Sequence, residues 1–156
     1  MSDSNPKFRE VSTSGPQYLG WRAELLTKLA LSRLGGLSFF ETSQNEPYDF
    51  VVATSEGSCF FVEVKAFSSI RLNMSKVDKI QELRWRIPSK LLAEANRSRN
   101  PFILFLFDAD TDHGRFLRLD SIPPTMNSAR FQTIRLPISN TITEKTLRAL
   151  VSELRS

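Results

Sequence analysis

The sequence contains one cysteine and one histidine, which excludes several classes of chemistry. Cys59 has no second cysteine with which to form an internal disulfide. Zinc sites built from cysteine and histidine need more of these ligands than the chain has. A nucleophile activated by histidine would depend on His113 alone. We therefore do not expect a catalytic relay through histidine.

Long apolar runs are also lacking. No stretch approaches the ~20 apolar residues that a membrane helix requires. The N-terminal MSDSNPKFRE lacks the apolar core of a signal peptide. No glycine-rich phosphate loop is present, so neither a nucleotide cofactor nor coupling to ATP is expected. We expect a cytoplasmic protein with no membrane partner.

The remaining composition is typical of one globular domain. The 156 residues are 40% apolar and 24% charged, and a chain of this length folds without a metal or disulfide staple. Residues 1–16 are rich in serine and contain Pro6, Gly15 and Pro16, which predicts a flexible N-terminal lead. Residues 17–156 are expected to form the single domain.

Positive charge is concentrated in one part of the chain. The net charge is only +4, but residues 65–100 carry nine basic side chains against three acidic ones. The rest of the chain is therefore slightly acidic. This distribution is expected where a polyanion docks on one face, although a solvated helix surface would have the same composition.

The first part of the chain predicts a helix and three strands. Apolar residues recur at helical spacing over 17–34, and Gly35-Gly36 is a helix stop. Strand-like runs follow at 37–42, 49–54 and 58–67, and Ser55-Glu56-Gly57 suits a tight turn between the last two. These strands are expected to form an antiparallel meander.

The second part predicts further helices and strands. Residues 75–96 have helical character, with a cap formed by Ser75 and Asp78 and a kink or break at Pro88. The apolar run 102–107 has no polar alternation, which indicates a strand buried on both faces. Strands over 114–119 and 131–138 and a helix over 141–154, begun by a capping box of Thr141 and Glu144, complete the chain.

The most informative pattern is Pro47-Tyr48-Asp49 in one strand and Glu63-Val64-Lys65 in the next. Alternate residues of a strand share a face, so Glu63 and Lys65 are expected to be neighbours. If the hairpin closes at Glu56-Gly57, Asp49 lies beside Glu63. Two carboxylates held together repel unless a cation lies between them, and such hard oxygen ligands suit Mg²⁺.

Glu24 on the first helix, Asp49, and Glu63-x-Lys65 on a meander, followed by a helix and a buried strand, resemble the PD-(D/E)XK nuclease superfamily. Tyr48 is inserted between the proline and the aspartate of its motif. The chain is most similar to small bacterial domains with a Gly-x-x-x-Glu helix, here Gly20 to Glu24, which are often associated with restriction or phage defence. The resemblance covers residues 17–120. It implies an α/β fold with a restriction-endonuclease-like core, a mixed β-sheet flanked by helices in the order α-β-β-β-α-β.

The resemblance also implies a DNA-cleaving enzyme. Asp49 and Glu63 would hold Mg²⁺ or Mn²⁺ with the carbonyl of Val64, and Lys65 would orient or deprotonate the attacking water. Glu24 would be a further ligand or would position Lys65. Gln81 on the following helix is a possible additional site residue.

The basic segment is the expected nucleic-acid surface, with DNA preferred to RNA as the partner. Phosphate contacts fix position without sequence preference. A homodimer or a larger defence complex is a possible assembly. The residues expected to contact nucleic acid are Arg71, Lys76, Lys79, Gln81, Arg84, Trp85, Arg86 and Lys90.

Simpler readings of the same residues stay open. Glu24 and Lys28 are spaced as an i,i+4 ion pair, which alone would explain both. Asp49 is also an ordinary turn residue after Pro47. The loop from Asp108 to Gly114 resembles a calcium loop, but its glycine is misplaced and the closing glutamate is missing, which favours a solvated hairpin loop. An inactive binding or interaction module of the same fold is the alternative function.

Overall fold

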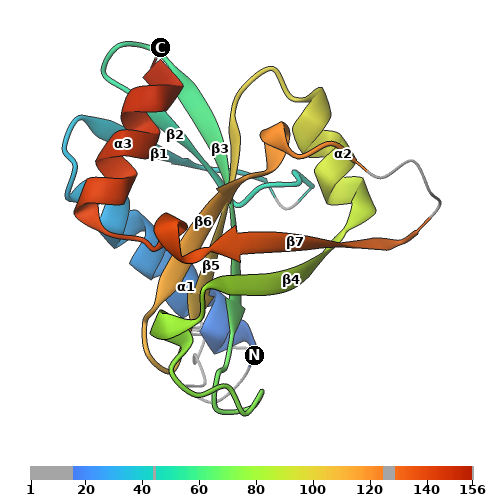
Figure 1. Ribbon diagram of the computed structural model, residues 1–156. Helices are drawn as coiled ribbons and strands as arrows, with labels where there is room; N and C mark the ends of the chain where they lie inside the picture. Colours follow the sequence, from blue (N-terminus) through green and yellow to red (C-terminus); the bar gives the residue numbers. More distant parts are fainter. Residues whose placement is uncertain (1–15, 44, 125–128, 156) are drawn as a thin grey trace, which may run out of the picture.

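The computed structural model describes residues 16–43, 45–124 and 129–155 (Figure 1). The helices of this part are α1 (Pro16–Ser32), α2 (Ser89–Arg97) and α3 (Glu144–Arg155). Its strands are β1 (Leu37–Glu41), β2 (Phe50–Thr54), β3 (Cys59–Phe67), β4 (Glu82–Pro88), β5 (Phe102–Asp108), β6 (Gly114–Arg118) and β7 (Phe131–Pro137). Short 3-10 turns cover Val77–Lys79, Leu119–Ser121 and Ile138–Asn140.

Five strands form one mixed sheet in the order β1-β2-β3-β5-β6. The first three strands are the predicted antiparallel meander, with β2 and β3 joined by a turn in which Gly57 adopts a positive φ of 88°. β3 and β5 are parallel, and the long connection that a parallel pair requires passes through β4 and α2. The predicted α/β class with a mixed sheet is confirmed.

The two faces of this sheet are covered by different elements. Phe60, Val62 and Val64 of β3 pack into one core beneath α1 and α3, together with Phe105. The alternate residues face a second core under α2, which includes Leu104. Every residue of β5 is buried, which confirms the strand expected to be covered on both faces.

A separate pair of strands covers part of the second face. β4 and β7 form an antiparallel two-stranded sheet, here called the β4–β7 ribbon, which crosses in front of the main sheet beside α2 (Figure 1). Leu83 and Ile87 of β4 and Ile134 and Leu136 of β7 are buried against the sheet. The intervening residues of both strands are directed outward, and the ribbon thus has one apolar and one exposed face.

The helix predicted over residues 75–96 is wrong in its first two thirds. Residues 77–79 form a single 3-10 turn, 82–88 are the strand β4, and only 89–97 are helical. The residues that pack inward from β4 are two apart, which is the strand period. The expected element order therefore lacks one strand, β4, between the meander and α2.

Two expectations at the ends of the chain also need correction. The predicted lead, residues 1–16, lies outside the described residues apart from Pro16, which begins α1. The capping box at the start of α3 is formed by Thr143 and Thr146, each of whose amides donates to the hydroxyl of the other, and not by Thr141 and Glu144. Among the described helices, none has the length and apolar character needed to cross a membrane.

Candidate active site

The candidate site lies where β2 and β3 separate. β2 pairs with β3 only as far as Phe50 and Val62, whereas β3 continues to Phe67. At the next position the Asp49 amide donates to the Val62 carbonyl at 2.8 Å, and Asp49 Oδ2 accepts a hydrogen bond from the Val64 amide at 2.7 Å. The Asp49 carboxylate therefore takes the place of a strand partner at this fork.

Glu63 and Lys65 project from β3 toward the face that carries α2 and the β4–β7 ribbon. Glu63 is only 8% exposed, and its Oε1 lies 2.8 Å from Lys65 Nζ. The side chain of Lys65 is 43% exposed, so the ammonium group is accessible although its carboxylate partner is largely buried. The predicted neighbours Asp49, Glu63 and Lys65 are thus brought together by the fork.

An open cleft gives access to Glu63 and Lys65. It is lined on one side by residues 45–47 and on the other by Pro88, Lys90 and Glu94, at the end of β4 and along α2. The cleft is about 280 Å³ in volume. A substrate group in this cleft would meet both β3 side chains.

α1 supplies a further carboxylate from the opposite face of the sheet. Glu24 lies 3.4 Å from Lys28 Nζ, as the i,i+4 spacing predicts. Lys28 also pairs with Glu41 of β1 and lies over the Phe50 ring, 5.0 Å from its centroid. Lys28 therefore links Glu24 to Glu41 of β1, at the end of the meander where Asp49 lies.

These side chains form an electrostatically connected group. Burial, followed by the nearby Asp49 carboxylate, raises the pKa of Glu63 to about 7. Burial is also the main reason that the pKa values of Asp49 and Glu24 are raised. When fully ionised, the four carboxylates exceed the two ammonium groups by two negative charges. The group consists of Glu24, Lys28, Glu41, Asp49, Glu63 and Lys65.

The donor atoms at the fork fit a hard divalent cation. Asp49 and Glu63 offer carboxylate oxygens, and the Val64 carbonyl leaves the strand on the same edge as the Val64 amide, toward Asp49. Within the described ranges no three acidic, histidine or cysteine side chains are close enough to hold a metal together. Mg²⁺ is commonly bound by one or two carboxylates, with water and substrate phosphates completing its shell. Two carboxylates and one carbonyl therefore agree with that preference.

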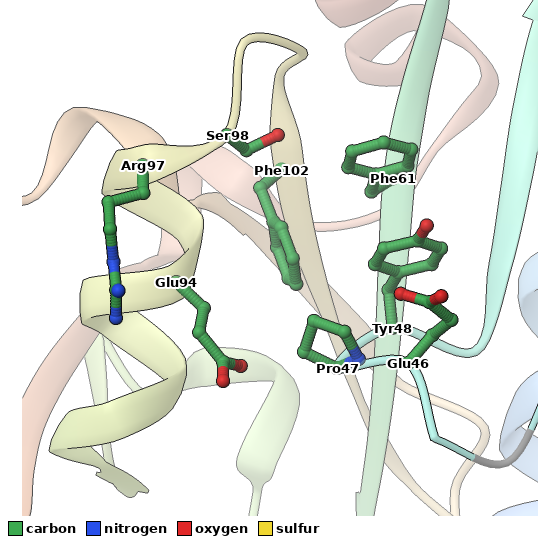
Figure 2. A pocket seen from close by; sticks show the side chains of 8 residues that line it. All are labelled: Glu46, Pro47, Tyr48, Phe61, Glu94, Arg97, Ser98 and Phe102. Carbon is green, nitrogen blue, oxygen red and sulfur yellow. The ribbon is translucent and has the colours of Figure 1, made fainter.

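An aromatic pocket adjoins the cleft (Figure 2). The rings of Tyr48 and Phe61 are stacked, with centroids 4.1 Å apart, and Phe102 lies across them at 6.0 and 6.2 Å. Pro47 and Glu94 line both the pocket and the cleft. The alternation of β3 indicates that Phe61 shares the face of Glu63, but the parallel pairing that adds Phe102 has no local sequence signal.

The basic residues expected to bind nucleic acid do not share one helical face. Arg84 and Arg86 lie on the exposed face of β4, and Lys90 lies at the mouth of the cleft. Lys76 and Lys79 are exposed in the connection between β3 and β4. The helix expected over residues 75–96 would have carried Lys76, Lys79 and Arg86 together, and this part of the expectation is wrong.

The other expected contact residues lie apart from this exposed face. Trp85 is half-buried on the inner face of the ribbon, with its ring 5.8 Å from that of Phe67. Gln81 precedes β4 and is not on a helix, and its carbonyl accepts a hydrogen bond from the Ile138 amide. Arg71 is exposed in the connection after β3.

The loop after β5 has a structural explanation. Asp108 is fully buried and accepts hydrogen bonds from the Ser69 amide at 2.9 Å and the Thr111 hydroxyl at 2.6 Å. Although burial opposes the change, these bonds lower the pKa of Asp108. β5 and β6 form the expected hairpin, with Asp110 and Asp112 exposed at its tip. Asp108 itself is a buried anchor, unlike the solvated residue expected from the sequence.

The comparisons with protein-family models and with curated sequences add no residue to this site. Asp49, Glu63 and Lys65, with the cleft beside them, are therefore the basis of the functional argument. Models of known protein families and curated protein sequences were both compared with the chain, and neither comparison finds a match.

Proposed function

We propose that this protein hydrolyses phosphodiester bonds of DNA with the help of a divalent cation. The observation that carries the proposal is the fork of β2 and β3. There the Asp49 carboxylate is held against the Val64 amide, next to the ion pair of Glu63 and Lys65 at an open cleft. Paired carboxylates and a lysine are the groups that metal-assisted phosphate chemistry requires.

The order of the elements supports a PD-(D/E)XK type of nuclease. A helix, a three-stranded meander, a second helix and a buried strand parallel to β3 follow one another, as in the restriction-endonuclease-like core. β4 is an addition to that order. Asp49 directly precedes β2 and Glu63 lies within β3, which are the two strands to which the resemblance assigns the motif.

The site residues take distinct roles in this proposal. Asp49 and Glu63, with the Val64 carbonyl, would hold Mg²⁺ or Mn²⁺. When bound, such an ion polarises a phosphate and lowers the pKa of a coordinated water. The exposed Lys65 ammonium, fixed by Glu63, would orient the attacking water and offset the negative charge that develops on the phosphate. Glu24 would act through Lys28 and the shared negative field, as a positioning residue.

The proposal predicts cleavage that depends on both the cation and the fork. Supercoiled plasmid, linear duplex and single-stranded DNA are incubated with Mg²⁺ or Mn²⁺, and in parallel with EDTA. Wild type should cleave with the cation only, and Glu63→Gln and Lys65→Ala should each lower the rate at least about 100-fold. Lys145→Gln on α3, which removes an exposed lysine away from the cleft, is the matched control.

Melting curves establish that each variant is folded. Full activity in folded Glu63→Gln or Lys65→Ala would contradict the mechanism.

A second candidate is a binding module that does not cleave. It is favoured by two contacts: Glu63 is already paired with Lys65, and Asp49 already accepts a hydrogen bond from the Val64 amide. In such a module these contacts would only stabilise the fork. Specific DNA binding without cleavage of any of the three substrates, with either cation, would support this candidate.

A further inference from the structure

We propose that the exposed face of the β4–β7 ribbon docks duplex DNA by lying in its major groove. This inference deepens the proposed function and rests on it, because it names the form of the substrate and the surface that receives it. The surface is defined by the exposed residues Arg84, Arg86, Phe131, Thr133 and Arg135.

The arrangement of charge on this face favours a polyanion. Arg84 and Arg135 are directly opposite each other in the ribbon, and like charges in that position are destabilising. Glu82 compensates only Arg135, with 3.3 Å between Oε1 and Nε. Among the described residues, neither Arg84 nor Arg86 forms an ion pair. The negative charge of a bound nucleic acid would offset this repulsion between Arg84 and Arg135.

The Arg86 side chain is also held in place before any partner binds. The Arg86 guanidinium lies over the Phe131 ring, 4.8 Å from its centroid, although Phe131 is 46% exposed. An exposed cation–π contact of this kind orders a long side chain. Beneath the surface, Leu83 and Ile134 are buried, so the ribbon is fixed to the core.

The shape of the ribbon selects the form of the nucleic acid. The major groove of B-form DNA is about 12 Å wide and admits a two-stranded ribbon. The major groove of an A-form RNA duplex is too deep and narrow for side chains to read, and a single strand has no groove. A ribbon of two seven-residue strands therefore fits duplex DNA better than either alternative.

The ribbon leads directly to the candidate site. β4 ends at Pro88, and Pro88 and Lys90 line the same cleft as Glu63 and Lys65. A duplex that lies along the ribbon would therefore pass the mouth of the cleft, where a backbone phosphate could approach Lys65. Binding by the ribbon and cleavage at the fork are thus parts of one substrate path.

The test measures binding in EDTA, where cleavage does not interfere. The affinity for a duplex DNA oligonucleotide is determined across salt concentrations for wild type and for the double variant Arg84→Gln/Arg135→Gln. The matched control, Arg33→Gln/Lys145→Gln, instead removes two exposed positive charges, one from the turn after α1 and one from α3.

The ribbon variant should bind about tenfold more weakly, and the slope of log affinity against log salt concentration should become shallower by about 2 units, because two positive charges next to the DNA are removed. The control should bind like wild type. The melting temperature of the ribbon variant should be unchanged or higher, because the cross-strand repulsion is removed.

Four further arms identify the groove and the form of the nucleic acid. Bulky substituents at the 5-position of cytosine, which fill the major groove, should weaken binding, whereas netropsin in the minor groove should not. Single-stranded DNA and an RNA duplex of the same sequence should bind more weakly than the DNA duplex.

The inference is overturned if the ribbon variant and the control bind duplex DNA equally, or if netropsin alone displaces the protein. Tighter binding of a single strand would also overturn it. Cleavage that is unaffected by the ribbon substitutions would leave the proposed function intact and remove only the docking surface. Ribbon-dependent binding without any cleavage would support the docking surface and contradict the proposed function.

Discussion

Glu63 is buried next to a second carboxylate. Its protonation therefore makes the free energy of unfolding of the protein depend on pH. Its pKa of about 7 in the folded protein exceeds the usual 4.5, so the native state binds more protons than the unfolded chain between these values. Stability must then fall as pH rises through that window. The difference in pKa corresponds to about 3 kcal/mol at most. In the absence of a cation, ionisation of Glu63 therefore lowers the free energy of unfolding.

Glu63→Gln should remove much of this dependence. In EDTA, the free energy of unfolding of wild type should fall by about 1–3 kcal/mol between pH 5 and pH 8, measured by denaturant titration. The variant should show a flatter profile and should be more stable than wild type at pH 8. Glu144→Gln, which changes an exposed carboxylate on α3, should keep the wild-type profile. A variant profile as steep as that of wild type would show that Glu63 is ionised without cost.

For individual residues, the sequence predicts the neighbours at the fork but not the aromatic pocket beside it. The two-residue period of a strand places Glu63 beside Lys65, and the turn at Gly57 brings Asp49 across from them. The pairing of Phe61 with Phe102 joins residues far apart in the chain, so no local pattern predicts the aromatic pocket.

β4 is the element that sequence periodicity misplaces. Leu83 and Ile87 are four apart, which suits one face of a helix as well as one face of a strand. Residues 82–88 form a strand because they pair with β7, whose Ile134 and Leu136 complete the core beneath the ribbon. Because β7 is distant in the sequence, the competition between helix and strand is settled by tertiary packing.

The start of α3 offers a test of local structure. Thr143→Ala removes the hydroxyl that accepts from the Thr146 amide at 3.1 Å, and should lower the free energy of unfolding by about 1 kcal/mol. Glu144→Ala is the control, because Glu144 bonds Arg148 at the surface and caps no amide. Chemical denaturation measures both. An equal or larger loss in Glu144→Ala would assign the cap to the residue that the sequence pattern favours.

At the scale of the whole molecule, Arg115 joins the main sheet to the ribbon layer. Its side chain is fully buried and donates to the carbonyls of Leu136 at 3.0 Å, of Val77 at 3.2 Å and of Ile80. Its Nε donates to His113 Nε2 at 3.1 Å. A buried arginine surrounded by carbonyls fixes β7 and the turn before β4 to β6. The ribbon and the cleft are therefore parts of one packed body.

The central claim is that Asp49 and Glu63 bind a divalent cation at the fork, and calorimetric titration with Mn²⁺ tests it most directly. In the folded protein without a cation, Glu63 has a pKa of about 7, so binding of Mn²⁺ at pH 6.5 should release most of one proton. The number of protons released is obtained by repeating the titration in two buffers of different ionisation enthalpy. Asp49→Asn should melt at a higher temperature than wild type without cation and should lose the binding isotherm, because one ligand and one repelling charge are removed.

We therefore expect one saturable site in wild type, coupled to proton release, and none in Asp49→Asn. Equal Mn²⁺ binding by the two proteins, or the absence of any saturable binding by wild type, would contradict the account.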